Sequence, residues 1–360
     1  MFGIVSTISS LEKIFKSSSR WKEIILTSDC QVFVYKDKQI DDQFTILLSE
    51  SGRLFVRPEI ENFPSVEIIK KYSCCAFLMD IDSHMASCLQ EQYGIICQPV
   101  DELDDRIITC VDPDHFELMF KDCGYNWDRV LAGLTEPRMP SNCLFINDRY
   151  LFANDKFEDG NTRTPGLDNL ESIIDALLPK TFNDNPEGPE YFPYQILITY
   201  QVDYEKQKLN TEQLDERYKK VASKVNKLKK SISRNYKITF EVIGLDSNND
   251  FFTETHNRRI YSNYFTICCD HKIAAFNFNT STCTQTIEIL KLYSKLHKEK
   301  SDQPVKGHSS FLSKYTESIK RWMDISRINS YKFSKNGNCK QVIHYIENRL
   351  VDPNISTNVR

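Results

Sequence analysis

The sequence predicts an α/β protein in which a mixed sheet is flanked by helices, preceded by a smaller N-terminal α/β domain. Short apolar runs typical of buried strands alternate with segments of helical periodicity. Residues 74–99 have a strand, helix, strand order that predicts a parallel βαβ unit. The chain has 360 residues, of which 40% are hydrophobic, and this is enough for two domains with cores of their own.

The N-terminal domain is expected to span residues 1–140. Strands are predicted at 31–35, 44–48 and 53–57, with the last two joined as a hairpin across Ser51 and Gly52. The remaining predicted elements of this region are helices at 11–15, 65–72, 84–93, 114–121 and 127–134, and buried strands at 74–80 and 95–99. A proline-bearing connector at 135–140 sets the domain boundary.

The second domain is expected to span residues 141–300. It begins with an apolar strand at 143–146, and Pro179 ends a helix at 166–178. The other predicted elements are strands at 194–200, 238–243, 251–254, 259–267 and 273–278, and a long helix at 211–233. From residue 285 onward the chain is predicted to be mostly helical, with a break at 301–309, so residues 301–360 form a helical tail.

The long helix at 211–233 has the clearest periodicity in the chain. Its apolar positions follow helical spacing and are expected to face a sheet: Leu214, Tyr218, Val221, Val225, Leu228 and Ile232. The opposite face is basic, and no acidic residue lies between Arg217 and Glu241. The candidate nucleic-acid contacts are Lys220, Lys224, Lys227, Lys230 and Arg234, which would neutralise successive phosphates. The alternative interpretation is an ordinary solvated helix face.

Charge is distributed unevenly along the chain. Residues 1–140 contain 14 Lys and Arg against 23 Asp and Glu, a balance of −9, whereas the remainder has 32 against 27, or +5. A polyanion is therefore expected to prefer the C-terminal part, and the acidic N-terminal domain is a candidate surface for a protein partner.

The twelve cysteines occur singly or as adjacent pairs, without a C-x-x-C spacing. They are expected to be buried, reduced and free of metal. No apolar run is long enough for a membrane-spanning helix, and the N-terminus lacks the apolar core of a signal peptide. We therefore expect a cytoplasmic protein.

Residues 255–264 carry the most informative local pattern. Alternation along a strand places His256 and Arg258 on one face and Arg259 on the other. The segment gives His256-x-Arg258, four residues, then Asn263, which follows the phospholipase D pattern of His-x-Lys, four residues, then Asp. Arg replaces the Lys and Asn replaces the Asp. His256, Arg258, Arg259 and Asn263 are the candidate phosphate-binding residues.

On these residues, and on the order of elements from 143 to 278, the chain resembles the phospholipase D-like C-terminal domain of MIT-domain proteins. A set of uncharacterised bacterial proteins shares the similar His-containing segment. The resemblance covers a little over a third of the chain and implies half of a phospholipase D fold. Animal members of this family bind phosphoinositide membranes without the catalytic motif. The two replacements, and the single copy of a motif that the enzymes carry twice, favour binding over hydrolysis.

A second candidate site follows the predicted strand at 74–80. Asp80 and Asp82 lie where α/β folds place their ligands, at the carboxyl ends of strands, and two such carboxylates suit Mg²⁺ in a nuclease. The alternative interpretation is that these residues form turns and cap the following helix.

The favoured function is a non-catalytic protein that recognises phosphate, with nucleic acid as its ligand and no cofactor. Arginine suits bidentate phosphate recognition, which fits the exchange of Lys for Arg. One alternative is a phosphodiesterase or nuclease, using His256 as a nucleophile in a homodimer or Mg²⁺ at Asp80 and Asp82. A further alternative is an interaction protein within a bacterial complex, for which antiviral defence is one setting.

Overall fold

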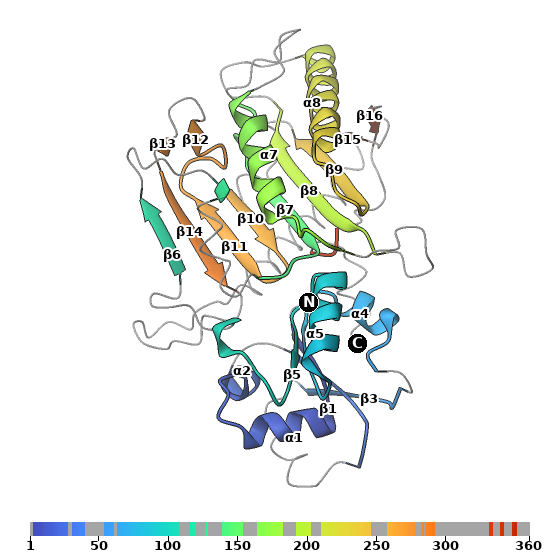
Figure 1. Ribbon diagram of the computed structural model, residues 1–360. Coiled ribbons are helices and arrows are strands. Elements are labelled where there is room, and N and C mark those ends of the chain that lie inside the picture. The colour runs from blue at the N-terminus through green and yellow to red at the C-terminus, as the bar shows by residue number, and fades with distance from the viewer. Residues whose placement is uncertain are drawn as a thin grey trace.

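The structure is a computed structural model with two β-sheets flanked by helices (Figure 1). The residues that it describes are 3–27, 31–39, 54–60, 63–107, 115–119, 127–128, 139–153, 164–182, 192–202, 210–245, 258–277, 282–283, 285–291, 331–333, 339–341 and 348–350. The α/β class predicted from the sequence is therefore confirmed.

The first sheet is parallel throughout and has the strand order β3-β2-β1-β4-β5. Its strands are β1 (Gly3–Thr7), β2 (Gln31–Tyr35), β3 (Leu54–Arg57), β4 (Ala76–Met79) and β5 (Cys97–Pro99). The strand order reverses between β1 and β4. In folds of this type, the carboxyl ends of the two strands at the reversal border the usual ligand crevice.

Helices connect the parallel strands of this sheet. They are α1 (Ile8–Lys16), α2 (Trp21–Thr27), α4 (Val66–Lys71) and α5 (Ser83–Tyr93), followed by a 3-10 turn at Asp105–Ile107. Figure 1 shows α1 and α2 on one side of the sheet and α4 and α5 on the other. This is the arrangement that right-handed crossovers produce on either side of a reversal. The βαβ unit predicted at residues 74–99 is confirmed as β4, α5 and β5.

The second sheet has nine strands in the order β16-β15-β9-β8-β7-β10-β11-β14-β6. Its strands are β6 (His115–Met119), β7 (Cys143–Asn147), β8 (Tyr194–Gln201), β9 (Ile238–Leu245), β10 (Arg258–Ser262), β11 (Phe265–Cys269), β14 (Thr286–Lys291), β15 (Tyr331–Phe333) and β16 (Cys339–Gln341). Strands β7, β8 and β9 are parallel, and the others pair antiparallel, so the sheet is mixed. A separate small ladder joins β12 (Phe276–Asn277) to β13 (Thr282–Cys283).

Two helices cover one face of the parallel part of this sheet, namely α7 (Pro165–Leu177) and α8 (Thr211–Ser231) (Figure 1). Asn210 begins α8 with a capping box, in which its side chain and that of Gln213 each accept a hydrogen bond from the other's backbone N–H. The predicted apolar face is confirmed at its four described positions, which are all buried: Val221, Val225, Leu228 and Ile232. The side chains of Leu214 and Tyr218 lie outside the described residues.

Several sequence-based predictions need correction. The segment expected as a helix at 114–121 contains a strand, β6, which pairs with β14 in the second sheet. A strand that precedes the predicted domain boundary at 135–140 therefore belongs to the second sheet. The tail expected to be helical from 285 contributes β14, β15 and β16. The apolar runs alone do not distinguish strand from helix in segments this short, and partner strands distant in sequence decide the outcome.

Two further corrections concern strand pairing. The strand expected at 259–267 is two strands, β10 and β11, with a tight turn at Asn263 and Tyr264. Strand β3 pairs in parallel with β2, whereas the sequence predicted a hairpin with 44–48. That partner segment and the predicted strand at 251–254 lie outside the described residues.

The two sheets meet at a joint formed by buried polar side chains. Asn142, just before β7, donates its side-chain amide to the carbonyls of Ser73, Tyr93 and Gly94 at 2.9, 3.2 and 3.3 Å. Asn263 donates to the carbonyls of Ser73 and Gly94 at 3.4 and 3.0 Å, and it accepts from the backbone N–H of Asn142 at 3.1 Å. Ser73 and Gly94 lie at the amino ends of β4 and β5. The sheets therefore touch through the amino ends of their parallel strands.

Gly94 is required at the joint for two reasons. It ends α5 in the left-handed conformation, with φ of 58°, which glycine adopts without strain. A Cβ atom on residue 94 would also lie 2.1 Å from the carbonyl oxygen of Ser141. The two sheets can approach each other closely at this point because glycine has no Cβ atom.

The packing of α8 gives a testable prediction. Val225 is 3% exposed, so Val225→Asp places an unpaired charge in the core and should lower the free energy of unfolding by about 3 kcal/mol. Ser223→Asp, on the exposed side of the same helix, is the control and should change stability by less than about 0.5 kcal/mol. Chemical denaturation measures both variants. Equal stabilities would contradict this packing.

Candidate anion site at the carboxyl edge of β7 and β8

Charged and polar side chains gather where β7 and β8 end and β10 begins. Asn147 is the last residue of β7, and its side-chain oxygen accepts a hydrogen bond from the Thr199 hydroxyl at 2.6 Å. Arg149 donates through Nε to the side-chain oxygen of Gln201, the last residue of β8. Because β10 runs antiparallel to β7, its first residue, Arg258, lies at this same edge.

Asp148 is the buried centre of this edge. One carboxylate oxygen accepts from the backbone N–H of Tyr150 at 2.8 Å, and the other accepts from the backbone N–H of Ile273 at 2.6 Å. Burial raises the pKa of Asp148 from its ordinary value of 3.8 to about 6, although the two N–H groups and the charges of Arg258 and Lys272 lower it. The carboxyl therefore changes charge in mildly acidic solution.

Two guanidinium groups contact the same aromatic ring at this edge. The Cζ atoms of Arg149 and Arg258 lie 5.4 and 5.3 Å from the centre of the Tyr150 ring, within the range of cation–π attraction. Arg258 also donates through Nη1 to the carbonyl of Asp270 at 2.8 Å. Its Nε is buried and has no hydrogen-bond partner among the described residues. Two guanidinium groups therefore lie at this edge, next to the buried carboxyl of Asp148.

The structure does not assemble the predicted phosphate-binding residues into one site. Arg258 and Ile260 lie on the same face of β10, and Ile260 belongs to the hydrophobic core cluster that also contains residues of α7 and α8. Arg259 lies on the opposite face. Asn263 follows the far end of β10, on the order of 16 Å from Arg258 at about 3.3 Å per residue. It is fully buried in the joint, so its position there corrects its assignment as a phosphate ligand. His256 lies outside the described residues.

The basic residues predicted on α8 divide into two groups. Lys220, Lys227 and Lys230 are exposed and Lys224 is half-buried, and Lys220 forms an ion pair with Glu216 at 2.8 Å. Arg234 is different, because it lies beyond the helix and donates to both the carboxylate and the carbonyl of Asp175, at 2.7 and 2.9 Å. We therefore remove Arg234 from the candidate contact surface and assign it to the contact with α7.

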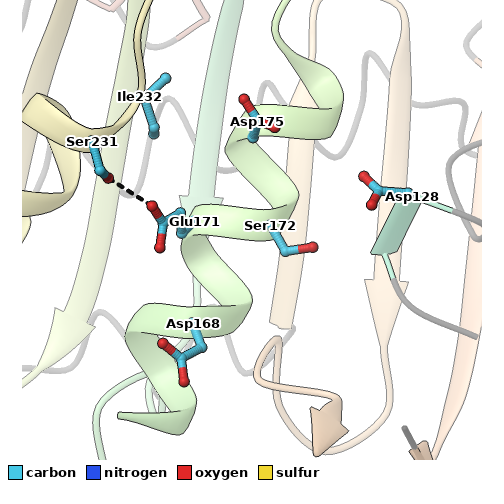
Figure 2. A pocket seen from close by; sticks show the side chains of 7 residues that line it. All are labelled: Asp128, Asp168, Glu171, Ser172, Asp175, Ser231 and Ile232. Atoms are coloured by element: carbon cyan, nitrogen blue, oxygen red, sulfur yellow. Dashed lines mark hydrogen bonds between the residues drawn. The ribbon is translucent and has the colours of Figure 1, made fainter. Parts of the chain in front are cut away.

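A cavity of about 330 Å³ lies beside α7 and the end of α8 (Figure 2). Carboxylates dominate its lining, which consists of Asp128, Asp168, Glu171, Ser172, Asp175, Ser231 and Ile232. The Ser231 hydroxyl donates to Glu171 at 2.6 Å, a contact drawn in Figure 2. Acidic side chains repel phosphate, so this cavity does not suit the predicted ligand class.

The carboxylates predicted to hold a metal have other partners. Asp82 caps α5 by accepting from the backbone N–H of Met85 at 2.8 Å, which confirms the capping interpretation. Asp80 pairs with Lys13 at 2.7 Å, and Lys13 also reaches Asp101 at 2.9 Å. In the described part of the chain, no group of three His, Cys, Asp or Glu side chains is placed to hold a metal ion.

The segment 147–150 was not among the sites predicted from the sequence. A usable signal was present, because a polar run directly after a buried parallel strand marks a carboxyl edge. The aromatic residues near the predicted motif belong to the core. Tyr261 stacks on Phe145, and the Tyr264 hydroxyl donates to the carbonyl of Cys75 at 2.7 Å within the joint.

Comparisons with protein-family models, with curated proteins and with solved structures found no match to this chain. None of the helices within the described ranges is long and apolar enough to cross a membrane.

The buried carboxyl of Asp148 predicts a pH dependence. A folded-state pKa raised from 3.8 to about 6 means that protonation stabilises the fold at low pH, and that this stabilisation is lost as pH rises through about 6. Asp148→Asn cannot titrate, so the stability of the natural protein relative to this variant should increase by about 2.4 kcal/mol between pH 8 and pH 4. Denaturation of both proteins across this range measures the difference. A difference independent of pH would contradict the assignment.

Proposed function

We propose that this protein binds the phosphates of a nucleic acid at the carboxyl edge of β7 and β8, without hydrolysing them. The observation that carries the proposal is the pair of guanidinium groups of Arg149 and Arg258 on the Tyr150 ring. Each of the two positive charges beside this ring attracts an anion. Arginine also offers the planar pair of donors that phosphate oxygens accept.

The geometry of Arg258 supports a ligand contact. Its Nη1 is held by the Asp270 carbonyl at 2.8 Å, which fixes the side chain, while the buried Nε has no partner among the described residues. A buried donor without an acceptor costs about 1 to 3 kcal/mol, and a phosphate oxygen would satisfy it once the side chain moves to expose Nε. Arg258 is therefore the central residue of the proposed site.

Several features favour binding over phosphodiester hydrolysis. The two oxygens of Asp148 already accept backbone N–H groups, so this carboxylate is oriented by the fold and is buried away from a substrate. Asn263 lies in the joint and has no role at the site. Asp80 and Asp82 are engaged with Lys13 and with the α5 cap. The proposed resemblance of residues 143–278 to phospholipase D-like domains also favours phosphate as the ligand.

A polymer of phosphates is favoured over a single headgroup because α8, which packs on the same sheet, carries further basic side chains. On the outside of α8, Lys220, Lys224 and Lys227 follow one helical stripe. Consecutive phosphates of a nucleic acid can contact such a stripe, and each contact displaces a counterion.

The proposal predicts that Arg258→Ala weakens binding of labelled single-stranded RNA or DNA by about 1 to 3 kcal/mol, or roughly 5- to 150-fold. The loss should be similar for different sequences, and the salt dependence should become shallower by about one phosphate contact. Fluorescence anisotropy over a series of salt concentrations measures both quantities.

Arg106→Ala is the matched control, since Arg106 is an exposed arginine in the 3-10 turn after β5 that pairs with Asp104 at 2.8 Å. It removes the same charge and should change affinity less than about twofold. Equal effects of the two variants would contradict the site, and so would unimpaired binding by Arg258→Ala. Cleavage of the labelled strand on addition of Mg²⁺ would instead favour the nuclease alternative.

A further inference from the structure

An imidazole, a thioether and a thiol lie together on the outer surface of α5. His84 and Cys88 are both exposed, and the Cys88 sulfur lies 3.9 Å from Nε2 of His84. Met85 is 47% exposed, which is unusual for a large apolar residue in the described part of the chain. Of the seven cysteines whose side chains the structure describes, Cys88 alone is exposed. These three side chains take no part in the contacts of the joint or of the anion site.

The helix itself brings the three side chains together. Successive residues of an α-helix advance by about 100°, so residues 84 and 88 lie about 40° apart and residue 85 lies about 60° from residue 88. All three therefore fall on one arc of about 100°. Asp82 holds the first turn by accepting from the backbone N–H of Met85 at 2.8 Å, and Gly94 ends the helix. The three positions are thus fixed on a regular, capped element.

The spacing of His84 and Cys88 suits a metal ion held between them. Bonds of about 2.0 Å to an imidazole nitrogen and about 2.3 Å to a thiolate, at angles of about 110 to 120°, place the two ligand atoms about 3.6 to 3.8 Å apart. The observed distance of 3.9 Å is close to this range, and both side chains are exposed and can adjust. The pair therefore needs little rearrangement to chelate a metal.

The third side chain determines which metal fits. A thioether is a soft ligand that favours monovalent copper, whereas zinc in proteins takes imidazole, thiolate and carboxylate. Methionine is unbranched and flexible, and residues three apart are neighbours on a helix, so the Met85 sulfur can reach the ion beside Cys88.

We propose that His84, Met85 and Cys88 bind a monovalent copper ion on the surface of α5, with an imidazole nitrogen, a thioether and a thiolate as its ligands. Because methionine supplies the third ligand, the site differs from the groups of three His, Cys, Asp or Glu side chains that are absent from the described residues. It lies on the first sheet and is independent of the anion site at the carboxyl edge of β7.

Binding exchanges a proton for the metal and involves no redox step. The Cys88 sulfur bonds to the copper ion as its proton leaves to water, and His84 binds as the neutral ring through Nε2, with its proton on Nδ1. The thiolate cancels the single positive charge of the ion. The positive end of the helix dipole therefore does not oppose the complex.

This site revises two expectations about the cysteines. Cys88 is exposed, which corrects the expectation that they are all buried. The expectation that they are free of metal rested on the absence of a C-x-x-C spacing, whereas a helix also brings together residues that are four apart.

The test is an anaerobic titration of the full chain with monovalent copper, in competition with the coloured chelator bicinchoninic acid and with ascorbate present. The natural chain should remove one more equivalent of copper from the chelator than Cys88→Ser does. Loss of a group that only orients a metal ligand already costs about 10- to 100-fold in affinity. His84→Gln and Met85→Leu, which each remove a ligand, should therefore weaken this equivalent by about tenfold or more.

Cys268→Ser is the matched control, because it removes a half-buried thiol of β11 and should retain the full affinity. Met85→Leu separates the copper site from a bare thiol, since it keeps Cys88 and nearly the same side-chain volume. Copper binding unchanged by Met85→Leu or by Cys88→Ser would overturn the site, and so would tighter binding of Zn²⁺ at these residues. X-ray absorption of the natural chain loaded with one equivalent should show one nitrogen and two sulfur ligands. Copper bound by sulfur alone would contradict the site even where a variant does not fold.

Discussion

The arrangement of this molecule depends on two asparagine side chains buried between its sheets. Asn142 and Asn263 together satisfy the carbonyls of Ser73 and Gly94, which lie at the amino ends of β4 and β5. Such carbonyls, buried without a partner, would each cost about 1 to 3 kcal/mol, so the two amides are what permits the sheets to approach. Gly94 completes the constraint, because a side chain there would collide with the backbone of Ser141.

The position of this joint agrees with the proposed ligand site. Since the sheets meet at the amino ends of their parallel strands, both carboxyl edges face away from the contact, and α/β folds bind ligands at those edges. The edge of the second sheet concentrates arginines around Tyr150, while at the edge of the first sheet Lys13 is neutralised by Asp80 and Asp101. The proposed anion site lies in residues 141–360, which carry the positive balance of charge, and the buried carboxyl of Asp148 interacts there with Arg258.

The sequence predicted those features that depend on local pattern. The apolar spacing in α8 and the strand, helix, strand order of β4, α5 and β5 are examples. Pairing between distant segments was not predictable in this way. Residues 115–119 and 286–291 become neighbouring strands through antiparallel backbone pairing between segments far apart in sequence, and their composition alone fits a helix equally well. Asn263 was misassigned for the same reason, since its hydrogen-bond partners are about 170 and 190 residues away in sequence.

Hydrogen exchange with and without a short single-stranded nucleic acid tests the central claim most directly, because it locates the contact without altering the chain. The account predicts slower exchange on binding at residues 147–151 and at the start of β10, and unchanged exchange in the joint at 73–76 and 94–97. Protection confined to the carboxyl edge of the first sheet, around Asp80 and Lys13, would contradict it. So would binding that leaves the carboxyl edge of β7 unprotected.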